Sequence, residues 1–359
     1  NVKRALVVGL GATGLSCVRY LRAQGYEVSV VDSRAAPPGL VELRRTFPEV
    51  ACHTGGFDER LFQAATLLVV SPGVSLREPA VARTVARGVE TLGDIELFAR
   101  AAKAPILAVT GANGKSTVTS LTGAMCREAG LATAVGGNIG VPALELLAQA
   151  PTDAYVLELS SFQLETTASL RPLAATVLNI TPDHMDRYRD LDEYAAAKAR
   201  VFRGEGVMVL NADDPRVMRM AVPGRTVVRF GLGVPASEHD YGLVMHGGEE
   251  WLAKGERRLL PAREVPLAGR HNLANVLAAM ALAEVAKVPF DAMKRAILHF
   301  KGLAHRTELV AERDGVRWIN DSKGTNVGAT LAALNGMTGP AVLIAGGDGK
   351  GADFSALKA

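Results

Sequence analysis

The sequence has 359 residues, enough for two or three domains with a sizeable buried core. Hydrophobic residues make up 48% of it, glycine is abundant and aromatic residues are few, which suits layered α/β domains rather than a fibrous or disordered chain. The net charge is only +3 and no dense Lys/Arg tract occurs, so we do not expect nucleic-acid binding.

The three cysteines, Cys17, Cys52 and Cys126, lie far apart and form no CxxC pair. We therefore expect reduced thiols in a cytoplasmic protein rather than a disulfide or a zinc site. No apolar run reaches membrane-spanning length and no signal peptide opens the sequence, so we expect no membrane insertion. Because the first residue is Asn1, we expect at least an initiator methionine before it.

The first glycine-rich stretch, residues 9–14 (Gly-Leu-Gly-Ala-Thr-Gly), follows a strand expected over residues 4–9. A helix over residues 15–24 and a second strand over residues 26–31 complete a βαβ unit, and Asp32 ends it. A GxGxxG loop in this context is typical of diphosphate binding, because a helix N-terminus attracts phosphate. Three interpretations stay open: NAD with Asp32 on a ribose hydroxyl, another diphosphate such as a UDP-sugar, or a tight structural turn.

The second glycine-rich stretch, residues 110–117 (Thr-Gly-Ala-Asn-Gly-Lys-Ser-Thr), lies between an apolar strand at residues 105–109 and a helix expected over residues 116–129. This order predicts a nucleotide-phosphate cradle, since backbone N–H groups can close around phosphate oxygens. Lys115 can reach the terminal phosphates and the Ser116 hydroxyl can bind Mg²⁺. Only two residues separate the two glycines, so the loop is a shortened relative of the P-loop.

The two loops are expected to lie in consecutive domains. The first domain continues with a strand over residues 67–70 and closes near Gly93, and a connecting helix is expected over residues 95–102. A simple dehydrogenase needs one dinucleotide loop. Two loops therefore predict a protein that holds two phosphorylated ligands.

Two polar residues follow apolar strands beyond the second loop. Glu158 ends a strand expected over residues 154–158, and His184 follows one expected over residues 175–180. The carboxyl ends of parallel strands carry the chemistry of α/β sheets, and a carboxylate there can hold Mg²⁺ against ATP phosphates. The alternatives are a solvated strand-end acid for Glu158 and a structural role for His184.

Helices supply three more candidates. Lys198 lies on a helix expected over residues 191–202 among alanines, and this local pattern predicts a solvated surface lysine. Asn272 and Asn275 are three residues apart at the start of a helix expected to reach Ala286, so they share a face that could read a purine edge. The alternative for Asn272 is helix capping.

The remaining elements are shorter. A strand is expected over residues 207–211 and short antiparallel strands over residues 237–263. A hairpin around Asp314, a helix over residues 330–334 and a strand over residues 341–345 follow. Because this last unit holds so few elements, we expect the sequence to lack the remainder of a C-terminal α/β domain.

Taken together, the motifs resemble those of the Mur ligase family. The matching stretches are both glycine-rich loops, Ser71 to Gly73, and residues 93–98, 136–140, 158–165, 179–188, 269–275, 304–306 and 320–326. The resemblance implies an α/β chain of three domains. These are a Rossmann-like domain for the UDP substrate at residues 1–93, a central P-loop ATPase-type domain with a mostly parallel sheet at residues 94–300, and a partial Rossmann-like domain for the amino acid at residues 301–359.

The resemblance also implies a reaction. ATP phosphorylates the alanyl carboxylate of UDP-N-acetylmuramoyl-L-alanine, the amine of D-glutamate attacks the acyl phosphate, and phosphate leaves to form an amide in peptidoglycan precursor synthesis. Positioning and charge stabilisation dominate such transfers. The alternatives are a sibling amide ligase with another acceptor such as L-glutamate, a folylpolyglutamate synthase type, and a catalytically silent nucleotide-binding protein.

Matching positions carry implied roles. The expected catalytic residues are Lys115, His184 and Lys198. The expected ligands of two Mg²⁺ ions, or of Mn²⁺ in their place, are Ser116, Glu158, His184 and Lys198, with Lys198 carbamylated. The expected ATP contacts are Gly111, Asn113, Gly114, Lys115, Ser116, Thr117, Asn272, Asn275, Arg306 and Asp321. The expected substrate contacts are Ala12, Thr13, Asp32, Arg34, Gly73, Asn138, His184, Thr325 and Lys350. Pro182 and Gly324 depart from the family pattern, which leads us to expect Glu and Ala there.

Overall fold

The computed structural model describes residues 3–149, 151–337, 339–349 and 351–358. The chain divides into two compact units. Unit 1 is drawn from Asn1–Lys103, Gly136–Ala150 and Leu159–Leu170, and unit 2 from Ala104–Val135, Pro151–Glu158 and Arg171–Ala359. None of the helices in the described residues is both long enough and apolar enough to cross a lipid bilayer.

Unit 1 is built on a parallel sheet of five strands in the order β3-β2-β1-β4-β5. The strands are β1 (Arg4–Val8), β2 (Glu27–Asp32), β3 (Ala51–Thr54), β4 (Leu67–Val70) and β5 (Glu90–Leu92). The helices are α1 (Ala12–Ala23), α2 (Leu40–Thr46), α3 (Glu59–Ala64), α4 (Pro79–Ala86), α5 (Asp94–Ala101), α7 (Ala143–Leu146) and α8 (Ser161–Glu165). β4 and all but the first residue of β1 are buried, which explains their unbroken apolar sequences.

The first glycine-rich loop lies where the strand order of this sheet reverses. β1 pairs with β2 on one side and with β4 on the other, and a crevice at such a point is where open α/β sheets bind ligands. Helix α1 begins at Ala12, three residues before the expected start, so Ala12 and Thr13 belong to its first turn. Gly25 follows the helix with a φ of 78°, in the left-handed conformation that ends many helices.

A second sheet has nine strands in the order β14-β13-β12-β11-β10-β9-β6-β8-β7. The strands are β6 (Ile106–Thr110), β7 (Thr133–Gly137), β8 (Ala154–Glu158), β9 (Ala174–Val177), β10 (Val207–Asn211), β11 (Val227–Phe230), β12 (Tyr241–His246), β13 (Glu249–Lys254) and β14 (Arg257–Pro261). The pairings from β8 through β6, β9 and β10 to β12 are parallel, whereas β12, β13 and β14 are antiparallel. The predicted α/β class with a mostly parallel central sheet is confirmed.

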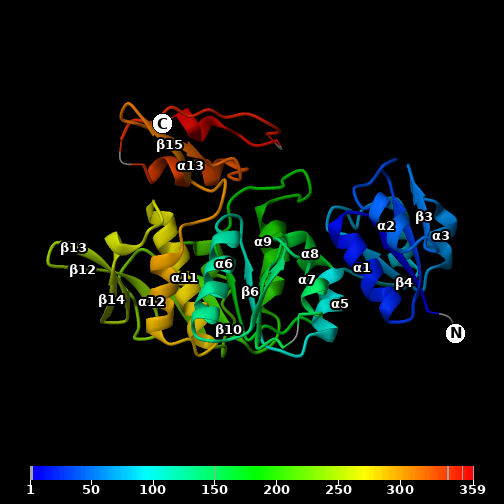
Figure 1. The fold of residues 1–359 in the computed structure, drawn as a ribbon, viewed down its shortest axis with the longest axis horizontal. Coiled ribbons are helices and arrows are strands. Elements are labelled where there is room, and N and C mark those ends of the chain that lie inside the picture. Colours follow the sequence, from blue (N-terminus) through cyan, green and yellow to red (C-terminus); the bar gives the residue numbers. More distant parts are fainter. Residues whose placement is uncertain (1–2, 150, 338, 350, 359) are drawn as a thin grey trace. The chain divides into compact units, whose positions relative to one another are not determined.

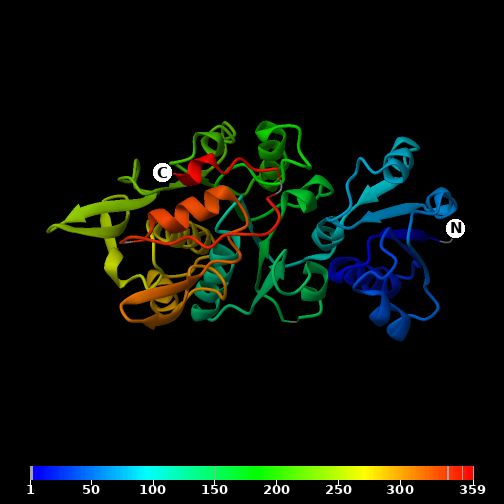
Figure 2. The same ribbon diagram turned by 90° about the horizontal axis from the view of Figure 1, so that it is seen from above.

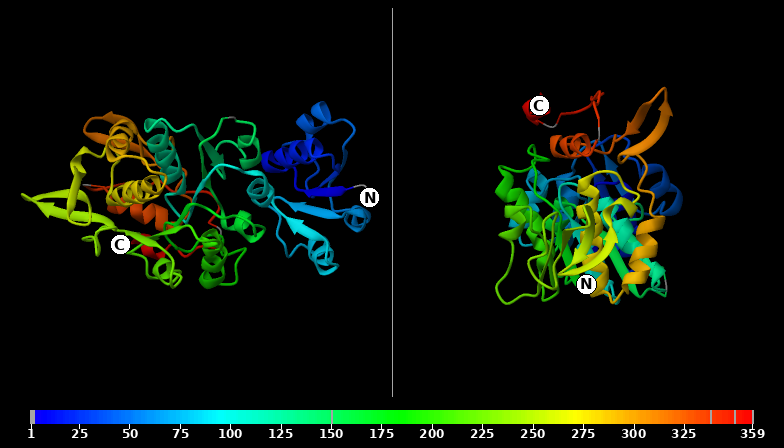
Figure 3. Two further views of the ribbon diagram at one scale, coloured as in Figure 1. Left: turned by 90° about the horizontal axis from the view of Figure 1, so that it is seen from below. Right: turned by 90° about the vertical axis from the view of Figure 1, so that its left-hand side faces the viewer.

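The core of unit 2 lies between this sheet and three long helices, α6 (Lys115–Glu128), α11 (Arg270–Val285) and α12 (Phe290–His299). Helix α6 packs against both α11 and α12 (Figure 1). Most of α11 is buried around its whole circumference, which accounts for its lack of a polar face. Shorter helices are α9 (Leu191–Ala199) and α10 (Pro215–Met218). The β12–β13 hairpin extends away from the helices as a long ribbon (Figures 2 and 3).

The last part of the chain lacks one predicted strand, and its helix begins three residues earlier than expected. The hairpin around Asp314 is present as β15 (Glu308–Arg313) and β16 (Val316–Asn320), and α13 (Val327–Asn335) follows. The strand expected over residues 341–345 was wrong, because these residues form no regular element and Val342 and Ile344 are 94% and 84% exposed. A strand needs a neighbour, and β15 and β16 pair only with each other within the described residues.

Two buried acids at the start of α5 have opposite environments. Asp94 is 1% exposed, and burial raises its pKa to about 6 although Gln163 Nε2 donates a hydrogen bond to it at 3.0 Å. Glu96 is also buried, but hydrogen bonds from Ser169, from the Ala168 N–H and from Arg100 outweigh that burial and lower its pKa to about 2. Ionisation of the buried Asp94 carboxyl therefore lowers the stability of the folded chain.

The substitution Asp94→Asn tests this effect. The folded chain binds the Asp94 proton more tightly than the unfolded chain, so stability is present at low pH and is lost as the pH rises through about 6. Asparagine keeps a neutral acceptor for Gln163. The variant should therefore exceed the wild type in free energy of unfolding by up to ~3 kcal/mol above that pH, and match it near pH ~4.

Scanning calorimetry of both proteins at about pH 4 and about pH 8 would measure this difference. The exposed Glu27→Gln, which removes a surface pair with Arg4, is the matched control and should change little. A gain of equal size at both pH values would contradict the assignment.

Candidate active site

The second glycine-rich loop joins β6 to α6, as predicted. Gly111 and Gly114 have φ angles of 144° and 85°, which side-chain-bearing residues rarely adopt. A Cβ atom on Gly114 would lie 2.4 Å from Oδ1 of Asn275, so the loop packs directly against the start of α11. The N-terminus of α6 lies at this loop, and its backbone N–H groups and dipole favour an anion there.

Two basic side chains lie at the loop. Lys115 Nζ donates to the carbonyl oxygens of Gly111 and Ala112, each at 3.0 Å. Ser116 is 6% exposed, and its Oγ accepts a hydrogen bond from Arg306 Nη2 at 2.9 Å. The structure thus brings Arg306 to the loop from a position 190 residues further along the chain. Two cations beside a cradle of N–H groups suit a polyphosphate.

Asn113 is held on both sides by residues to which sequence reasoning gave no individual role. Its N–H donates to Asn179 Oδ1 at 2.8 Å, and Asn179 Nδ2 donates to its carbonyl oxygen at 3.0 Å. Its side-chain Nδ2 donates to Thr181 Oγ1 at 3.2 Å and to Asn326 Oδ1 at 3.3 Å. The position of Asn179 could have indicated this contact, because it follows β9, the strand that pairs in parallel with β6.

Lys198 is buried beneath this loop, and the prediction of a solvated surface lysine was wrong. Its side chain is among the largest that are fully buried, and the residue is 2% exposed. Nζ lies 3.4 Å from Thr110 Oγ1 and 4.7 Å from the ring centroid of Tyr194. Lys198 is buried on α9 together with Tyr194 and Ala197, and the local sequence pattern does not reveal this tertiary packing.

The surroundings of Lys198 favour its uncharged form. Burial lowers its pKa well below the usual value, and the positive charge of Lys115 lowers it further. The nearby carboxylates of Asp183 and Glu158 act in the opposite direction but are outweighed. A buried neutral amine is a nucleophile, whereas an ammonium is not.

Glu158 and His184 occupy different environments. Glu158 ends β8 and is 2% exposed, which rules out the solvated strand-end acid. His184 lies in an irregular segment after β9, with a φ of 55° and a side chain 34% exposed. Its Nε2 is 3.7 Å from Asp183 Oδ2, and its N–H donates to Asp183 Oδ1 at 3.0 Å.

The donors around the loop suit a hard cation. No three His, Cys, Asp or Glu side chains gather as a metal site in the part of the chain that the structure describes. The predicted metal ligands include only two residues of those types, Glu158 and His184, and the others are the Ser116 hydroxyl and Lys198. A buried carboxylate and a buried hydroxyl are oxygen donors of the kind that Mg²⁺ prefers, so the residues fit the ion.

Asn272 and Asn275 form a buried pair on α11. Asn275 Nδ2 donates to Asn272 Oδ1 at 3.1 Å, and Asn272 Nδ2 donates to the carbonyl oxygen of Ala268 at 2.7 Å. The helix begins after Gly269 without a side-chain cap, so the capping interpretation of Asn272 was wrong. The pair lies beside Gly114 of the loop.

Three residues predicted or remarked on in the last segment, Asp321, Gly324 and Thr325, lie among the described residues. Asp321 Oδ1 accepts a hydrogen bond from the Thr307 N–H at 2.8 Å, and Thr325 is exposed. A Cβ atom on Gly324 would lie 2.6 Å from Asp321 Oδ2, which gives a physical reason for glycine where the resemblance led us to expect alanine. Lys350 lies outside the described residues.

In unit 1, the two ends of the first glycine-rich loop, Gly9 and Gly14, approach each other closely. A Cβ atom on Gly14 would lie 2.0 Å from the Gly9 carbonyl oxygen, and Ser71 Oγ donates to that oxygen at 3.0 Å. The Ser71–Gly73 motif is thereby joined to the loop. Of the other predicted contacts, Ala12, Gly73 and Asn138 are exposed and Thr13 is half-buried.

Asp32 is engaged within unit 1. Oδ2 accepts from the Leu10 N–H at 2.7 Å, and Arg34 donates to both carboxylate oxygens at 2.9 and 2.6 Å. Burial by itself would raise the pKa of Asp32, but these hydrogen bonds outweigh it and lower the pKa. Since the carboxylate already braces the loop, this geometry disfavours the NAD interpretation, in which it binds a ribose hydroxyl.

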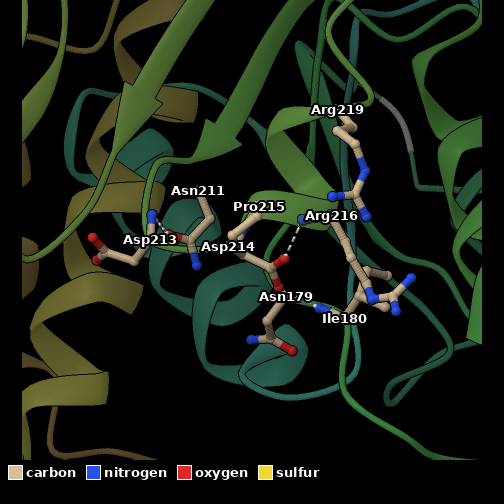
Figure 4. Close-up of a pocket in the computed structure, with 8 residues that line it drawn as sticks. All are labelled: Asn179, Ile180, Asn211, Asp213, Asp214, Pro215, Arg216 and Arg219. Atoms are coloured by element: carbon tan, nitrogen blue, oxygen red, sulfur yellow. Dashed lines mark hydrogen bonds between the residues drawn. The ribbon is translucent and has the colours of Figure 1, made fainter.

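A pocket of about 560 Å³ lies at the carboxyl ends of β9 and β10 (Figure 4). Its lining comprises Asn179, Ile180, Asn211, Asp213, Asp214, Pro215, Arg216 and Arg219. None of these was predicted as a site residue. Asp214 mainly shapes the turn, because its oxygens accept from the N–H groups of Ile180 at 2.8 Å and Arg216 at 2.9 Å.

Comparisons with known proteins match both parts of the chain that carry a glycine-rich loop. The sequence profile of the "Mur ligase MurD-like, N-terminal domain" matches residues 3–93, and that of the "Mur ligase middle domain" matches residues 109–283. The UDP-N-acetylmuramoylalanine–D-glutamate ligase of Nitrosococcus oceani is 57% identical over 98% of this chain and 78% of that protein. The enzyme of the same name from Methylobacillus flagellatus is 54% identical over 99% of this chain and 79% of that protein.

A solved structure shows the same fold at much lower identity. The UDP-N-acetylmuramate:L-alanyl-gamma-D-glutamyl-meso-diaminopimelate ligase from Neisseria meningitides has a TM-score of 0.59 and 20% identity, over 84% of this chain and 99% of that one. Identity above 50% with curated relatives over nearly the whole chain, together with both profile matches, establishes the relationship: the chain belongs to the Mur ligase family.

Proposed function

We propose that this chain is an ATP-dependent ligase that adds D-glutamate to UDP-N-acetylmuramoyl-L-alanine in peptidoglycan precursor synthesis. The observation that carries the proposal is the shortened phosphate loop with Lys198 buried beneath it, in a chain that matches D-glutamate ligases over nearly its full length. The reaction forms an amide by way of an acyl phosphate, and we place it in the cytoplasm.

The phosphate loop is the proposed ATP site. Its N–H groups, Lys115 and Arg306 would neutralise the phosphate oxygens and hold the terminal phosphate in line with the substrate carboxylate. The amide pair of Asn272 and Asn275 on α11 would contact the adenine side of the nucleotide. Lys115 donates to two carbonyl oxygens at 3.0 Å in the present arrangement, and both bonds can be exchanged for bonds to a phosphate.

We propose Mg²⁺ ligation by Ser116, Glu158, His184 and a carbamylated Lys198. The ions would screen the charge that builds up as phosphate is transferred. In the carbamylation, the neutral Lys198 amine attacks CO₂, an N–C bond forms, one C=O bond becomes a C–O⁻, and a proton is released. Burial supports this step, because it favours the neutral amine that the reaction needs.

The other substrates are assigned to the two ends of the chain. The loop at Gly9 in unit 1 would bind the UDP diphosphate, and Thr325 and Lys350 would bind the D-glutamate. We accordingly propose a UDP-substrate domain at residues 1–93, an ATP domain at residues 94–300 and an amino-acid-binding segment at residues 301–359. Residues 301–359 group in unit 2 with most of the proposed ATP domain, whereas residues 94–103, 136–150 and 159–170 group in unit 1.

Phosphate release by the full-length protein, measured with UDP-N-acetylmuramoyl-L-alanine, ATP and D-glutamate, tests the whole proposal. Release should require all three substrates, since the acyl phosphate is consumed only by the acceptor amine. L-Glutamate in place of D-glutamate is the control for a sibling ligase. Nucleotide binding without acceptor-dependent release would favour the catalytically silent alternative.

The substitution Lys198→Arg tests the carbamate. Arginine does not react with CO₂, so turnover should fall by roughly 10²-fold or more. Because a guanidinium stays charged when buried, a melting curve of the variant is needed to show that the loss does not come from unfolding. Lys294→Arg on α12 is the matched control and should leave turnover unchanged, because the neighbouring Arg295 contacts Glu128 at the end of α6 opposite the loop.

A second readout does not depend on activity. With ¹³C-labelled bicarbonate, the wild type should show a carbamate carbon resonance that Lys198→Arg lacks. An active Lys198→Arg variant, or a resonance that survives the substitution, would refute the role.

A further inference from the structure

Asn326 connects three separate stretches of unit 2 through one side chain. Its Nδ2 donates to Asn113 Oδ1 at 2.9 Å and to Asp183 Oδ2 at 3.2 Å. Its Oδ1 accepts from Asn113 Nδ2 at 3.3 Å and from the Ala329 N–H at 2.8 Å. Both polar atoms of the Asn326 amide therefore make two contacts each.

The partners of Asn326 are the parts of the proposed site. Asn113 is in the phosphate loop, Asp183 precedes His184, and Asn326 itself follows Thr325 and caps α13. The contact with Asn113 is reciprocal, because each amide donates to the other's oxygen. Since Asn179 already holds the Asn113 backbone, the Asn326 amide completes a clamp on this loop residue from the side-chain direction.

We infer that Asn326 is a positioning residue, an amide latch that holds the phosphate loop and the Asp183 segment in the geometry for nucleotide binding. The inference rests on the proposed function, because it assumes that the loop binds ATP. The latch also ties the loop to the segment that carries Thr325, so nucleotide binding and the placement of the acceptor segment depend on the same side chain.

The competing explanation is that Asn326 only caps α13. A cap needs one side-chain oxygen, and Asn, Asp and Ser serve about equally well at this position. The latch needs the Nδ2 donor as well. The substitution Asn326→Asp would keep the cap but would place a carboxylate against Asp183 Oδ2 and Asn113 Oδ1. The substitution Asn326→Ser would keep the cap and lose the reciprocal amide pair.

The test is binding of ADP with Mg²⁺ by isothermal titration calorimetry to the wild type, Asn326→Asp and Asn326→Ser. If the latch operates, both variants should bind about tenfold more weakly or worse, with Asn326→Asp the weaker, since hydrogen bonds are lost and a carboxylate repulsion is added. Melting temperatures near that of the wild type would show that the cap persists. Asp58→Asn exchanges the same two residue types at the cap of α3 in unit 1 and should leave binding unchanged.

A double-mutant cycle supplies a second, independent measurement. Asn113→Ala removes the partner amide, so adding Asn326→Ser to it should cause much less further loss than Asn326→Ser causes alone. Variants that bind within about twofold of the wild type, or additive losses in the cycle, would overturn the latch while leaving the proposed function intact. A wild type that binds no nucleotide would overturn both.

Discussion

The burial of Lys198 is the constraint on which the site depends. A lysine 2% exposed cannot keep its ammonium without a matching charge, and the nearest groups include a second lysine, Lys115. Burial accordingly lowers the pKa of Lys198, and two carboxylates, those of Glu158 and Asp183, lie close by. The burial that favours the neutral amine also leaves these two carboxylates close to it.

The phosphate loop depends on side-chain amides as much as on its glycines. Gly111 and Gly114 permit the tight path, but the path is held by Asn179 and Asn326, which contact Asn113 from the backbone side and from the side-chain side. Amides suit this task because each both donates and accepts, and neither adds a charge beside the phosphates. The loop is thus part of a network that reaches from β9 to α13.

Local pattern predicted several of the regular elements but assigned none to other stretches, such as those that form β5 and α12. Buried parallel strands such as β8 and β10 were located to the residue, because an unbroken apolar run of that length between turn residues has few alternatives. The strand expected over residues 341–345 had the same pattern but lacks a partner strand among the described residues. The start of α1 was placed three residues late, since Ala12 and Thr13 carry little periodic signal.

The sequence by itself determined the two glycine-rich loops, the α/β class and the candidate residues that directly follow strands. Glycine spacing and apolar runs are local, and they reflect backbone constraints that act within a few residues. Only the tertiary structure decided that Lys198 is buried, that Arg306 reaches Ser116, and that Asn179 and Asn326 clamp Asn113. These contacts join residues 66 to 213 positions apart, and their energies come from desolvation and from hydrogen-bond geometry, which no local pattern encodes.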